Sequence, residues 1–232
     1  MKWLLVVASI LAIVISKRGA DFGPDWANNF SVQDLQCLKS TGIEFLIIRG
    51  WQKYGAMDNT TINAHANANK VGFDWVDTYL FPCRTMNATD QVNQLVANLT
   101  QAKAQFGKIW LDVEINPWPG CGWDTFSFES NCEFLKELVQ AVRNANQTVG
   151  IYSSHYEWTS LFGTDTACSH FTDVPLWYAH FDSNKTFDDY YRLPFGGWTK
   201  PMIKQYIDLT RNTVCGFTID QDYIPDVTES VQ

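Results

Sequence analysis

The sequence has little positive charge and no long hydrophobic run beyond its first residues. Only 17 of its 232 residues are Lys or Arg, against 25 Asp or Glu, and the formal net charge is −8. Binding to a nucleic-acid backbone needs clustered Lys and Arg, so this composition argues against that class of protein. Neither Gly nor Pro recurs at a fixed period, which excludes a fibrous repeat. No C-x-x-C pair is present to support a zinc ribbon or a thioredoxin-type site.

The composition that remains is that of one acidic, aromatic-rich globular domain. Hydrophobic residues make up 46% of the chain and charged residues only 18%, which argues against disorder. Aromatic residues make up 15%, and ten of them are Trp. A chain of this length buries a sizeable core, and no linker or internal repeat divides it, so we expect a single domain.

The N-terminus has the pattern of a secretory signal peptide. Lys2 precedes a largely apolar run of thirteen positions, 3–15, and the small residue Ser16 follows it. A charged start, a short apolar stretch and a small residue are typical of such peptides. The alternative is a membrane anchor, but a membrane span needs ~20 apolar residues. Cleavage after Ser16 would remove Lys2 and change the net charge from −8 to −9.

We therefore expect residues 1–16 to be a signal peptide and 17–232 to be a single secreted domain with no membrane association after cleavage. The exact mature N-terminus stays open, because Lys17-Arg18 is a second candidate trimming site. The destination is either the outside of the cell or the lumen of an acidic digestive vacuole or lysosome.

Two further counts agree with export. The six Cys form an even set, which in an oxidising compartment predicts three disulfides with fifteen possible pairings. Cys121 and Cys132 are close enough in sequence to close a small loop, and we expect that pair. N-x-[ST] sequons, the acceptor sites for N-glycosylation, occur at Asn29, Asn59, Asn87, Asn98, Asn146 and Asn184.

Strand-like runs alternate with helix-like stretches through the first part of the chain. Runs of β-branched or aromatic residues occur at 19–22, 44–50, 74–81, 108–115 and 148–153. Stretches with helical periodicity or a capping residue occur at 31–39, 60–70, 89–106, 127–142 and 154–162. Five successive β–α units argue for a parallel sheet with right-handed crossovers.

After about residue 165 the alternation stops. Strand-like runs continue at 175–181, 202–207 and 214–220, with no convincing helix between them. Five βα units and three further strands make eight strands, which is enough to close a barrel. The predicted fold is α/β: an irregular TIM-like barrel of five βα units followed by three β-strands.

In barrels built from βα units, functional side chains lie where the strands end, at the carboxyl rim. The run 108–115 is one such strand. Alternation puts Asp112 and Glu114 on the same face as Trp110, with the two acidic Cα atoms ~7 Å apart. Acids on a buried face carry an uncompensated desolvation cost, which favours a functional site, although a strand end in solvent would make them harmless. Flanking Trp110 and Trp118 favour function, because indole faces stack on sugars.

Two further acids are expected at the same rim. Asp21 ends the first predicted strand and Asp220 ends the last, and these strands are neighbours if the barrel closes. Each acid alone is more often a helix or turn cap. Together with Asp112 and Glu114 they would crowd negative charge, so that at least one proton is retained near neutral pH. A retained proton is the condition for a general acid in glycoside hydrolysis.

Several short motifs occur in a fixed order along the chain. They are 19–22 (GADF), 78–81 (TYLF), 110–114 (WLDVE), 150–153 (GIYS), 176–180 (LWYAH), 204–206 (KQY) and 219–220 (ID). In this order they resemble the motifs of family-25 glycoside hydrolases, the Chalaropsis-type lysozymes. The similarity spans 19–223, and the segment 195–201 (FGGWTKP) looks most like amoebozoan and nematode members.

The resemblance implies an irregular barrel of the kind described above, with N-acetylmuramidase activity. This is cleavage of the β-1,4 link between N-acetylmuramic acid and N-acetylglucosamine in bacterial peptidoglycan, here by one lysozyme catalytic domain. Carried over by position, Glu114 would be the general acid, and Asp112 would orient and charge-stabilise the reacting sugar or its N-acetyl group. Asp21 and Asp220 would tune the site and hold substrate. A covalent intermediate and assistance by the N-acetyl group both stay open.

The resemblance also implies a set of residues that line the cleft. These are Tyr79, Tyr152, Trp177 and Tyr206, with core packing as the alternative for each. Arg49, at the end of the second predicted strand, is either a rim cation or half of a structural ion pair. Many members have His where this chain has Leu80, so a contribution from that His would be missing. We expect no metal, because none of the four His has a ligand spacing, and no cofactor.

Three other classes compete with the lysozyme interpretation. One is a secreted structural or toxin module, which would explain neither the order of the barrel elements nor the carboxylates. A chitinase-like barrel also uses a D-x-E pair, but with two further Asp at alternating positions where this chain has Lys108 and Trp110. A non-catalytic sugar-binding relative would be expected to have lost Glu114 or Asp112, and both are present. The expectation is a monomer that acts on peptidoglycan. A net negative charge would be repelled by anionic walls at neutral pH, so we expect an acidic activity optimum.

Overall fold

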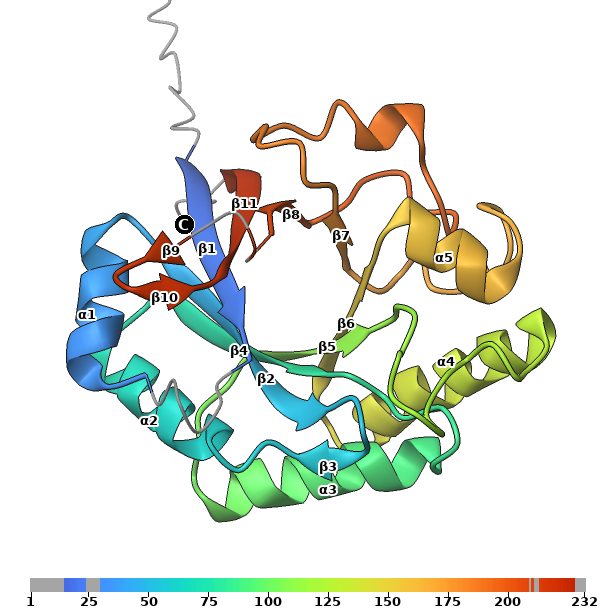
Figure 1. Cartoon of the computed structure of the whole chain (residues 1–232), viewed down its shortest axis with the longest axis horizontal. Coiled ribbons are helices and arrows are strands. Elements are labelled where there is room, and N and C mark those ends of the chain that lie inside the picture. The colour runs from blue at the N-terminus through green and yellow to red at the C-terminus, as the bar shows by residue number, and fades with distance from the viewer. Residues whose placement is uncertain (1–14, 24–29, 209, 211–212, 228–232) are drawn as a thin grey trace, which may run out of the picture.

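In the part of the chain that the structure describes, eight strands close into a barrel and five α-helices cover its outside (Figure 1). The computed structural model describes residues 15–23, 30–208, 210 and 213–227. Residues 1–14 of the predicted signal peptide therefore lie outside the described residues. Within them, no helix is both long enough and apolar enough to cross a membrane.

The order of the elements follows the predicted alternation. They are β1 (Ile15–Phe22), α1 (Val32–Ser40), β2 (Phe45–Gln52), β3 (Ala56–Met57), α2 (Thr61–Val71), β4 (Trp75–Leu80), α3 (Ala88–Gln101), β5 (Lys108–Asp112), α4 (Phe128–Asn144), β6 (Thr148–Ser153), α5 (His155–Phe162), β7 (Leu176–Ala179), the 3-10 helix η1 (Tyr190–Arg192), β8 (Ile203–Ile207), β9 (Thr213–Val214), β10 (Phe217–Thr218) and β11 (Asp220–Val227). The predicted fold class is confirmed: five βα units are followed by β7, β8 and β11.

Seven barrel strands are parallel and one is not. Around the barrel the order is β1, β2, β4, β5, β6, β7, β8 and β11, and β11 runs antiparallel to both of its neighbours, β8 and β1. Figure 1 shows the consequence: the blue N-terminal strand β1 lies beside the red C-terminal strand β11. Because β11 runs backwards, its first residues lie at the rim where the other strands end.

The prediction of one strand over 214–220 is wrong. Cys215 and Gly216 both have positive φ, 55° and 82°, and turn the chain in a two-residue hairpin between β9 and β10. Such turns match the twist of paired strands, and Gly adopts this conformation without strain. Asp220 is therefore the first residue of the last barrel strand rather than its end.

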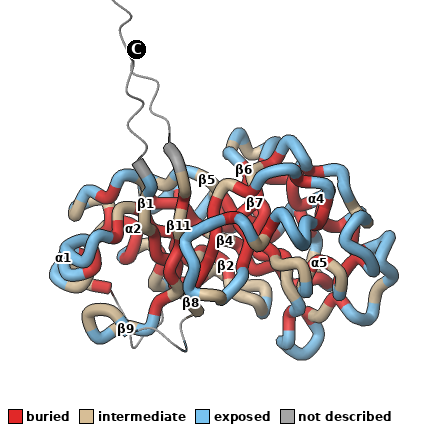
Figure 2. Tube along the Cα trace, turned by 90° about the horizontal axis from the view of Figure 1, so that it is seen from above, coloured by how far each residue is buried: buried red, intermediate tan, exposed pale blue. Residues whose placement is uncertain are grey.

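The barrel interior is filled with aromatic and aliphatic side chains. Phe45, Trp110, Tyr152 and Trp177 belong to one buried cluster inside it. Trp110 fits only because residue 150 is Gly, since a Cβ there would come within 2.3 Å of the indole. Larger clusters pack the helices against the outside of the sheet, and Figure 2 shows the barrel strands as mostly buried. Trp110 is fully buried, so it cannot stack on a sugar as expected from the sequence.

Three disulfides form, as the even count predicts, but the pairing expected for Cys121 and Cys132 is wrong. The bonds are Cys37–Cys215, Cys83–Cys121 and Cys132–Cys168. Cys132 lies on α4, which packs against α5, and therefore meets the loop that follows α5. Cys121 instead meets the segment after β4. The Cys37–Cys215 bond joins α1 to the β9–β10 hairpin.

Candidate active site

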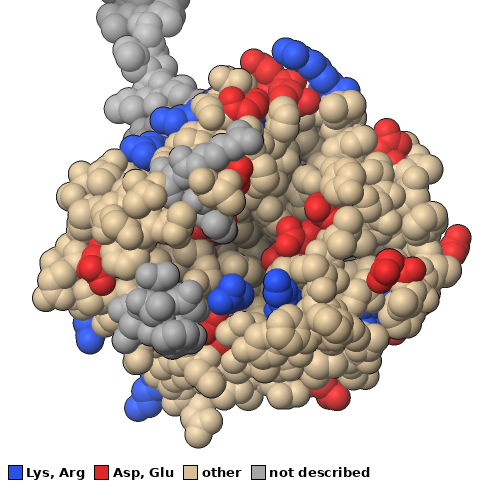
Figure 3. Space-filling model, in the orientation of Figure 1, with Lys and Arg blue, Asp and Glu red and all other residues tan. Residues whose placement is uncertain are grey.

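The carboxyl ends of the parallel strands and the start of β11 bring five acids together at one rim. We call them the rim cluster: Asp21, Asp112, Glu114, Asp220 and Asp222. Asp21, near the end of β1, lies directly opposite Asp220, the first residue of β11, in the antiparallel register. Figure 3 shows the result as a hollow in the centre of this face, with acidic side chains on its wall.

Asp112 and Glu114 stand on the floor and at the mouth of this hollow. Asp112 ends β5, and its side chain is buried with 7% of its surface exposed. Its Oδ1 has no hydrogen-bond partner among the described residues. The backbone N–H of Val113 donates to the carbonyl of Tyr152 at 2.9 Å, which ties the segment after β5 to β6. Glu114, one residue further, is half-buried.

Glu114 opens onto a cavity of about 610 Å³. We call it the α5 cavity, because α5 and the segment after β7 form its walls. Its lining includes Glu114, Tyr152, Glu157, Tyr178, His180 and Phe195. The cavity is larger than one side chain and is continuous with the rim cluster through Glu114 and Tyr152, so it gives a bound molecule access to the acids.

A chain of hydrogen bonds fixes the acid on β1. The Gln205 amide donates to Asp21 Oδ2 at 2.7 Å, and the Tyr152 hydroxyl donates to Gln205 Oε1 at 2.7 Å. Both acceptors and donors are buried. Gln205 was quoted in the KQY motif but given no function, and this contact supplies one: it positions the Asp21 carboxyl.

Asp222 is an acid of the site that the sequence analysis missed. It is fully buried, and its Oδ1 accepts from the indole N–H of Trp177 at 2.8 Å. Its other oxygen, Oδ2, is buried without a hydrogen-bond partner among the described residues, and the charge of Asp222 raises the pKa of Asp21. The two-residue spacing from Asp220 was a usable signal, but the prediction ended the last strand at Asp220.

Burial is the main cause of an unusual protonation pattern in the rim cluster. Desolvation, followed by the negative charge of neighbouring acids, raises the pKa of Asp21, Asp112 and Asp222 well above the ordinary value. The same causes raise the pKa of Glu114 to about 7. Glu114 is therefore a carboxyl that still carries a proton in mildly acidic solution.

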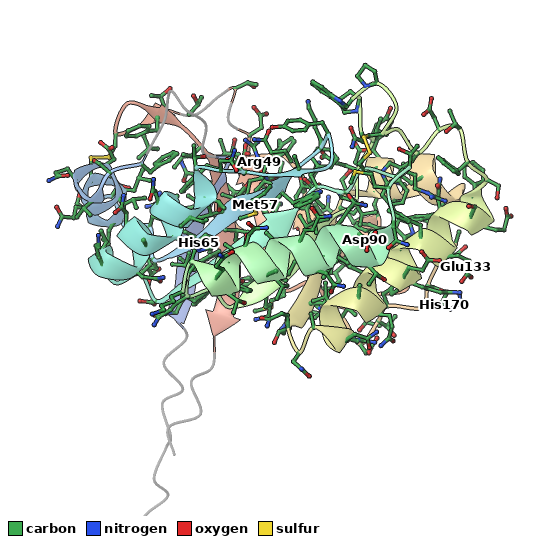
Figure 4. The ribbon with its side chains drawn as sticks, turned by 90° about the horizontal axis from the view of Figure 1, so that it is seen from below. Arg49, Met57, His65, Asp90, Glu133 and His170 are labelled. Atoms are coloured by element: carbon green, nitrogen blue, oxygen red, sulfur yellow. A yellow bond between two sulfur atoms is a disulfide. The ribbon has the colours of Figure 1, made fainter. Side chains whose placement is uncertain are left out.

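Arg49 was expected to be either a rim cation or half of a structural ion pair, and it shows features of both. It forms an ion pair with Asp58 at 3.0 Å, and its charge also lowers the pKa of Asp112. The side view of Figure 4 labels Arg49 near the upper edge of the barrel. Tyr79, on the neighbouring strand β4, is half-buried beside it, and burial raises the pKa of its hydroxyl. Both residues lie near the carboxyl ends of their strands, and a contact of either with substrate stays a prediction.

The other predicted lining residues divide by strand face. Trp177 is almost fully buried and forms part of the floor under Asp222. Tyr206 follows Gln205 on β8 and points to the opposite face, where its hydroxyl donates to Gln221 at 2.7 Å. The structure therefore does not bring Tyr206 to the rim cluster. Exposed aromatic side chains in the α5 cavity, which Glu114 lines, are Tyr156 and Phe181. A second exposed pair, Tyr54 and Trp118, lies on the loops after β2 and β5, with its rings 5.2 Å apart.

A second group of charged residues lies on the outer face of β8. We call it the lysine cluster: His180, Asp182, Asp189 and Lys204. The three possible metal ligands of this group lie within 4.8 Å of one another, a juxtaposition that their sequence spacing did not predict. However, the fully buried Lys204 ammonium already binds both carboxylates, at 2.9 Å and 2.7 Å. The lysine cluster is an ion-pair network around one buried ammonium, which lies where a metal ion would otherwise meet the two carboxylates.

A barrel of βα units with paired carboxyls at its carboxyl rim, one of them protonated near neutrality, defines the class of glycoside hydrolases. Comparison with known proteins gives the family. The family model described as Lysozyme-like protein 1 matches residues 16–206. Probable GH family 25 lysozyme 4 of Dictyostelium discoideum is 36% identical over 227 residues, covering 97% of this chain and 100% of that protein. The chain belongs to glycoside hydrolase family 25, the GH25 lysozymes.

Two further relatives agree. Lysozyme-like protein 5 of Caenorhabditis elegans is 33% identical over 228 residues, covering 97% of this chain and 100% of that protein. The solved structure of a family GH25 lysozyme from Aspergillus fumigatus matches the fold with a TM-score of 0.68 at 19% identity, covering 90% of this chain and 94% of that one. This protein is accordingly a glycoside hydrolase of the lysozyme type.

Proposed function

We propose that this protein is a secreted lysozyme that hydrolyses the β-1,4 bond between N-acetylmuramic acid and N-acetylglucosamine in bacterial peptidoglycan. The observation that carries the proposal is Glu114: a carboxyl at the mouth of an acid-lined hollow, with a pKa of about 7. A glycosidase needs a carboxylic acid that is still protonated at its working pH. Membership of a lysozyme family supports the choice of substrate.

In the proposed reaction, the Glu114 carboxyl gives its proton to the oxygen that links the two sugars. The bond between that oxygen and the anomeric carbon breaks, and the sugar on the other side develops positive charge. Water then adds to the anomeric carbon, and the proton it releases returns to the rim cluster. Asp112 assists in the proposal by accepting a hydrogen bond from the N-acetyl group of that sugar; the support is that its buried Oδ1 has no hydrogen-bond partner among the described residues.

Exposed aromatic side chains on the loops of the carboxyl rim offer the sugars a surface to stack on. Tyr54 and Trp118 expose 40% and 45% of their surface, and both come from loops at the carboxyl rim. The amide of Asn116 donates to the carbonyls of Lys53 and Pro82, which ties these loops together. We propose that the Tyr54–Trp118 pair stacks on sugar rings of the glycan. Stacking was expected of Trp110 and Trp118, and of these two only Trp118 is exposed.

Product analysis tests the proposal most directly. Purified peptidoglycan is digested, the new reducing ends are converted to alcohols with borohydride, and the hydrolysate is examined for muramicitol and glucosaminitol. Muramicitol is the expected product. Glucosaminitol would mean a glucosaminidase, digestion of chitin would favour the chitinase-like alternative, and no new ends would favour a non-catalytic sugar-binding protein.

We further propose that the protein is exported as a monomer, to the outside of the cell or to an acidic digestive compartment. The N-terminal pattern supports this, as do the three disulfides. The described sequon residues are all exposed: Asn59, Asn87, Asn98, Asn146 and Asn184. The test is to isolate the mature protein from its source, sequence its N-terminus and measure the mass lost on enzymatic deglycosylation. A retained Met1 and an unmodified mass would reject export.

A further inference from the structure

A carboxylate outside the rim cluster reaches the peptide that follows the catalytic acid. Glu157, in the first turn of α5, accepts a hydrogen bond at its Oε2 from the backbone N–H of Ile115, at 2.7 Å. Ile115 directly follows Glu114. The backbone N–H of Glu157 in turn donates to the hydroxyl of Ser154, the N-cap of α5, at 3.1 Å. Helix α5 and the segment that carries Glu114 are thereby joined by one side chain.

An acid three residues after the N-cap of a helix ordinarily accepts a hydrogen bond from the N-cap backbone, which Glu157 does not do. In α1 the corresponding residue is Asp34, three residues after the N-cap Ser31, and its carboxylate accepts from the Ser31 backbone N–H at 2.8 Å. That reciprocal arrangement caps the helix. Glu157 occupies the same position in α5, yet its carboxylate extends across to Ile115 instead. Its side chain therefore acts on a different segment of the chain from the helix it begins.

The Glu157 carboxylate also places negative charge beside the catalytic acid. Both residues line the α5 cavity, and Glu157 is half-buried there. The charged groups that act on Glu114 are Glu157 and Asp220, which raise its pKa, and Lys53, which lowers it. Glu157 is the largest of these charge effects, second only to burial, and it also raises the pKa of Asp112. A charge in this position favours the protonated form of Glu114.

We propose that Glu157 is a positioning residue for Glu114. Its carboxylate holds the peptide that follows Glu114 in place, and its negative charge acts on the Glu114 carboxyl. This inference rests on the proposed function of Glu114 as the acid. The two parts are separable. The hydrogen bond needs only an acceptor, which a Gln side chain also supplies, whereas the electrostatic part needs the negative charge.

Two variants at this position separate the two parts. Glu157→Gln keeps an acceptor for the Ile115 N–H but removes the charge, so the alkaline limb of the pH profile of kcat/KM should move to lower pH by about half a unit or more. Glu157→Ala removes both, so kcat should fall about tenfold or more even at the optimum pH, because misplacement of a catalytic group is costly. The matched control is Asp34→Asn, which alters the corresponding acid of α1 and should leave the profile unchanged.

A direct titration keeps the test independent of turnover. Carboxyl NMR of 13C-labelled protein should show a lower pKa for Glu114 in Glu157→Gln than in the unmodified protein. An unchanged alkaline limb and an unchanged Glu114 pKa would overturn the electrostatic part, and a full kcat in Glu157→Ala would overturn the positioning part. If Glu114→Gln remained active, the proposed function would fail instead, and the NMR titration would still report whether Glu157 acts on Glu114.

Discussion

The rim cluster and the lysine cluster contain the same kind of side chain in opposite electrostatic states. In the rim cluster, burial and mutual repulsion raise the pKa of Asp21, Asp112 and Asp222. In the lysine cluster, hydrogen bonds and the charge of Lys204 outweigh desolvation and lower the pKa of Asp182 and Asp189.

The difference lies in how far each cluster is supplied with positive charge. Lys204 is fully buried and binds both of its carboxylates within 3.0 Å. At the rim, Arg49 is held by Asp58 and lowers the pKa of Asp112 only in part. In the lysine cluster, an ammonium neutralises the carboxylates, and the result is a structural ion pair. At the rim, the acids are neutralised by bound protons instead, and an acid that holds a proton near neutral pH can transfer that proton. The predictions below break each cluster in turn.

The largest effect is expected on removing the transferable proton. Glu114→Gln should lower kcat on peptidoglycan by about 10²–10⁴-fold, because the amide cannot protonate the leaving oxygen. The melting temperature should stay the same or rise, since a buried acid with a raised pKa is lost. Turnover assays with thermal melting of the same preparation check both. Activity near that of the unmodified protein would remove Glu114 from the reaction.

The next effect is expected in the lysine cluster, and on stability rather than on chemistry. Lys204→Met should lower the free energy of unfolding by about 3 kcal/mol, because it leaves Asp182 and Asp189 without their counter-ion. Urea denaturation measures the change. The kcat of the folded fraction should stay within about tenfold of the unmodified value, since no proton of the reaction passes through this cluster. A large loss of kcat without a loss of stability would contradict the division between the clusters.

The pH dependence of stability should follow the rim cluster. A carboxyl whose pKa is higher in the folded chain than in the unfolded chain binds its proton more tightly when folded. The stability it contributes is complete below the ordinary value and is lost as the pH rises through the folded value; for Glu114 this window runs from 4.5 to about 7.

The melting temperature should therefore fall as the pH is raised from about 5 to about 8, over the range in which these carboxyls lose their protons. Asp222→Asn should flatten that fall, because Asp222 then adds no charge beside Asp21. Differential scanning calorimetry across the range measures both curves. A melting temperature that rises over this interval would show that the rim acids are not held in their protonated state.

The smallest effect is expected at a surface pair of the same residue types. Arg143 and Asp173 lie 2.7 Å apart, but both side chains are largely exposed. Arg143→Ala should change the free energy of unfolding by less than about 1 kcal/mol, because water and salt screen such pairs. Urea denaturation beside Lys204→Met gives the comparison. An equal loss in the two variants would mean that burial is not what makes the lysine cluster strong.

The repeating βα units of the fold could be predicted from the sequence. Alternation of apolar runs predicts the five βα units and the three later strands, since strand and helix each have a local period. The D-x-E pair after β5, and the acids near β1 and β11, were also placed at the rim. These features depend on residues close together in the chain.

Features that depend on distant contacts were not predictable in the same way. The antiparallel direction of β11 depends on its pairing with β8 and β1. The turn at Cys215-Gly216, which divides the strand predicted over 214–220, is instead a local feature. By contrast, the pairing of Cys132 with Cys168 depends on how α4 and α5 pack. Glu157 belongs to the site only because α5 begins beside the end of β5. No spacing in the sequence expresses that proximity.

The antiparallel last strand also makes completion of the site depend on the last part of the chain. Asp21 comes from the first strand, whereas Asp220 and Asp222 come from the last, and a disulfide joins Cys37 to Cys215 across 178 residues. A chain still being synthesised holds Asp112 and Glu114 long before it holds β11. Without that strand the barrel has an open seam and the site lacks part of its acid wall. The complete acid wall therefore exists only once synthesis has reached β11 and the barrel has closed.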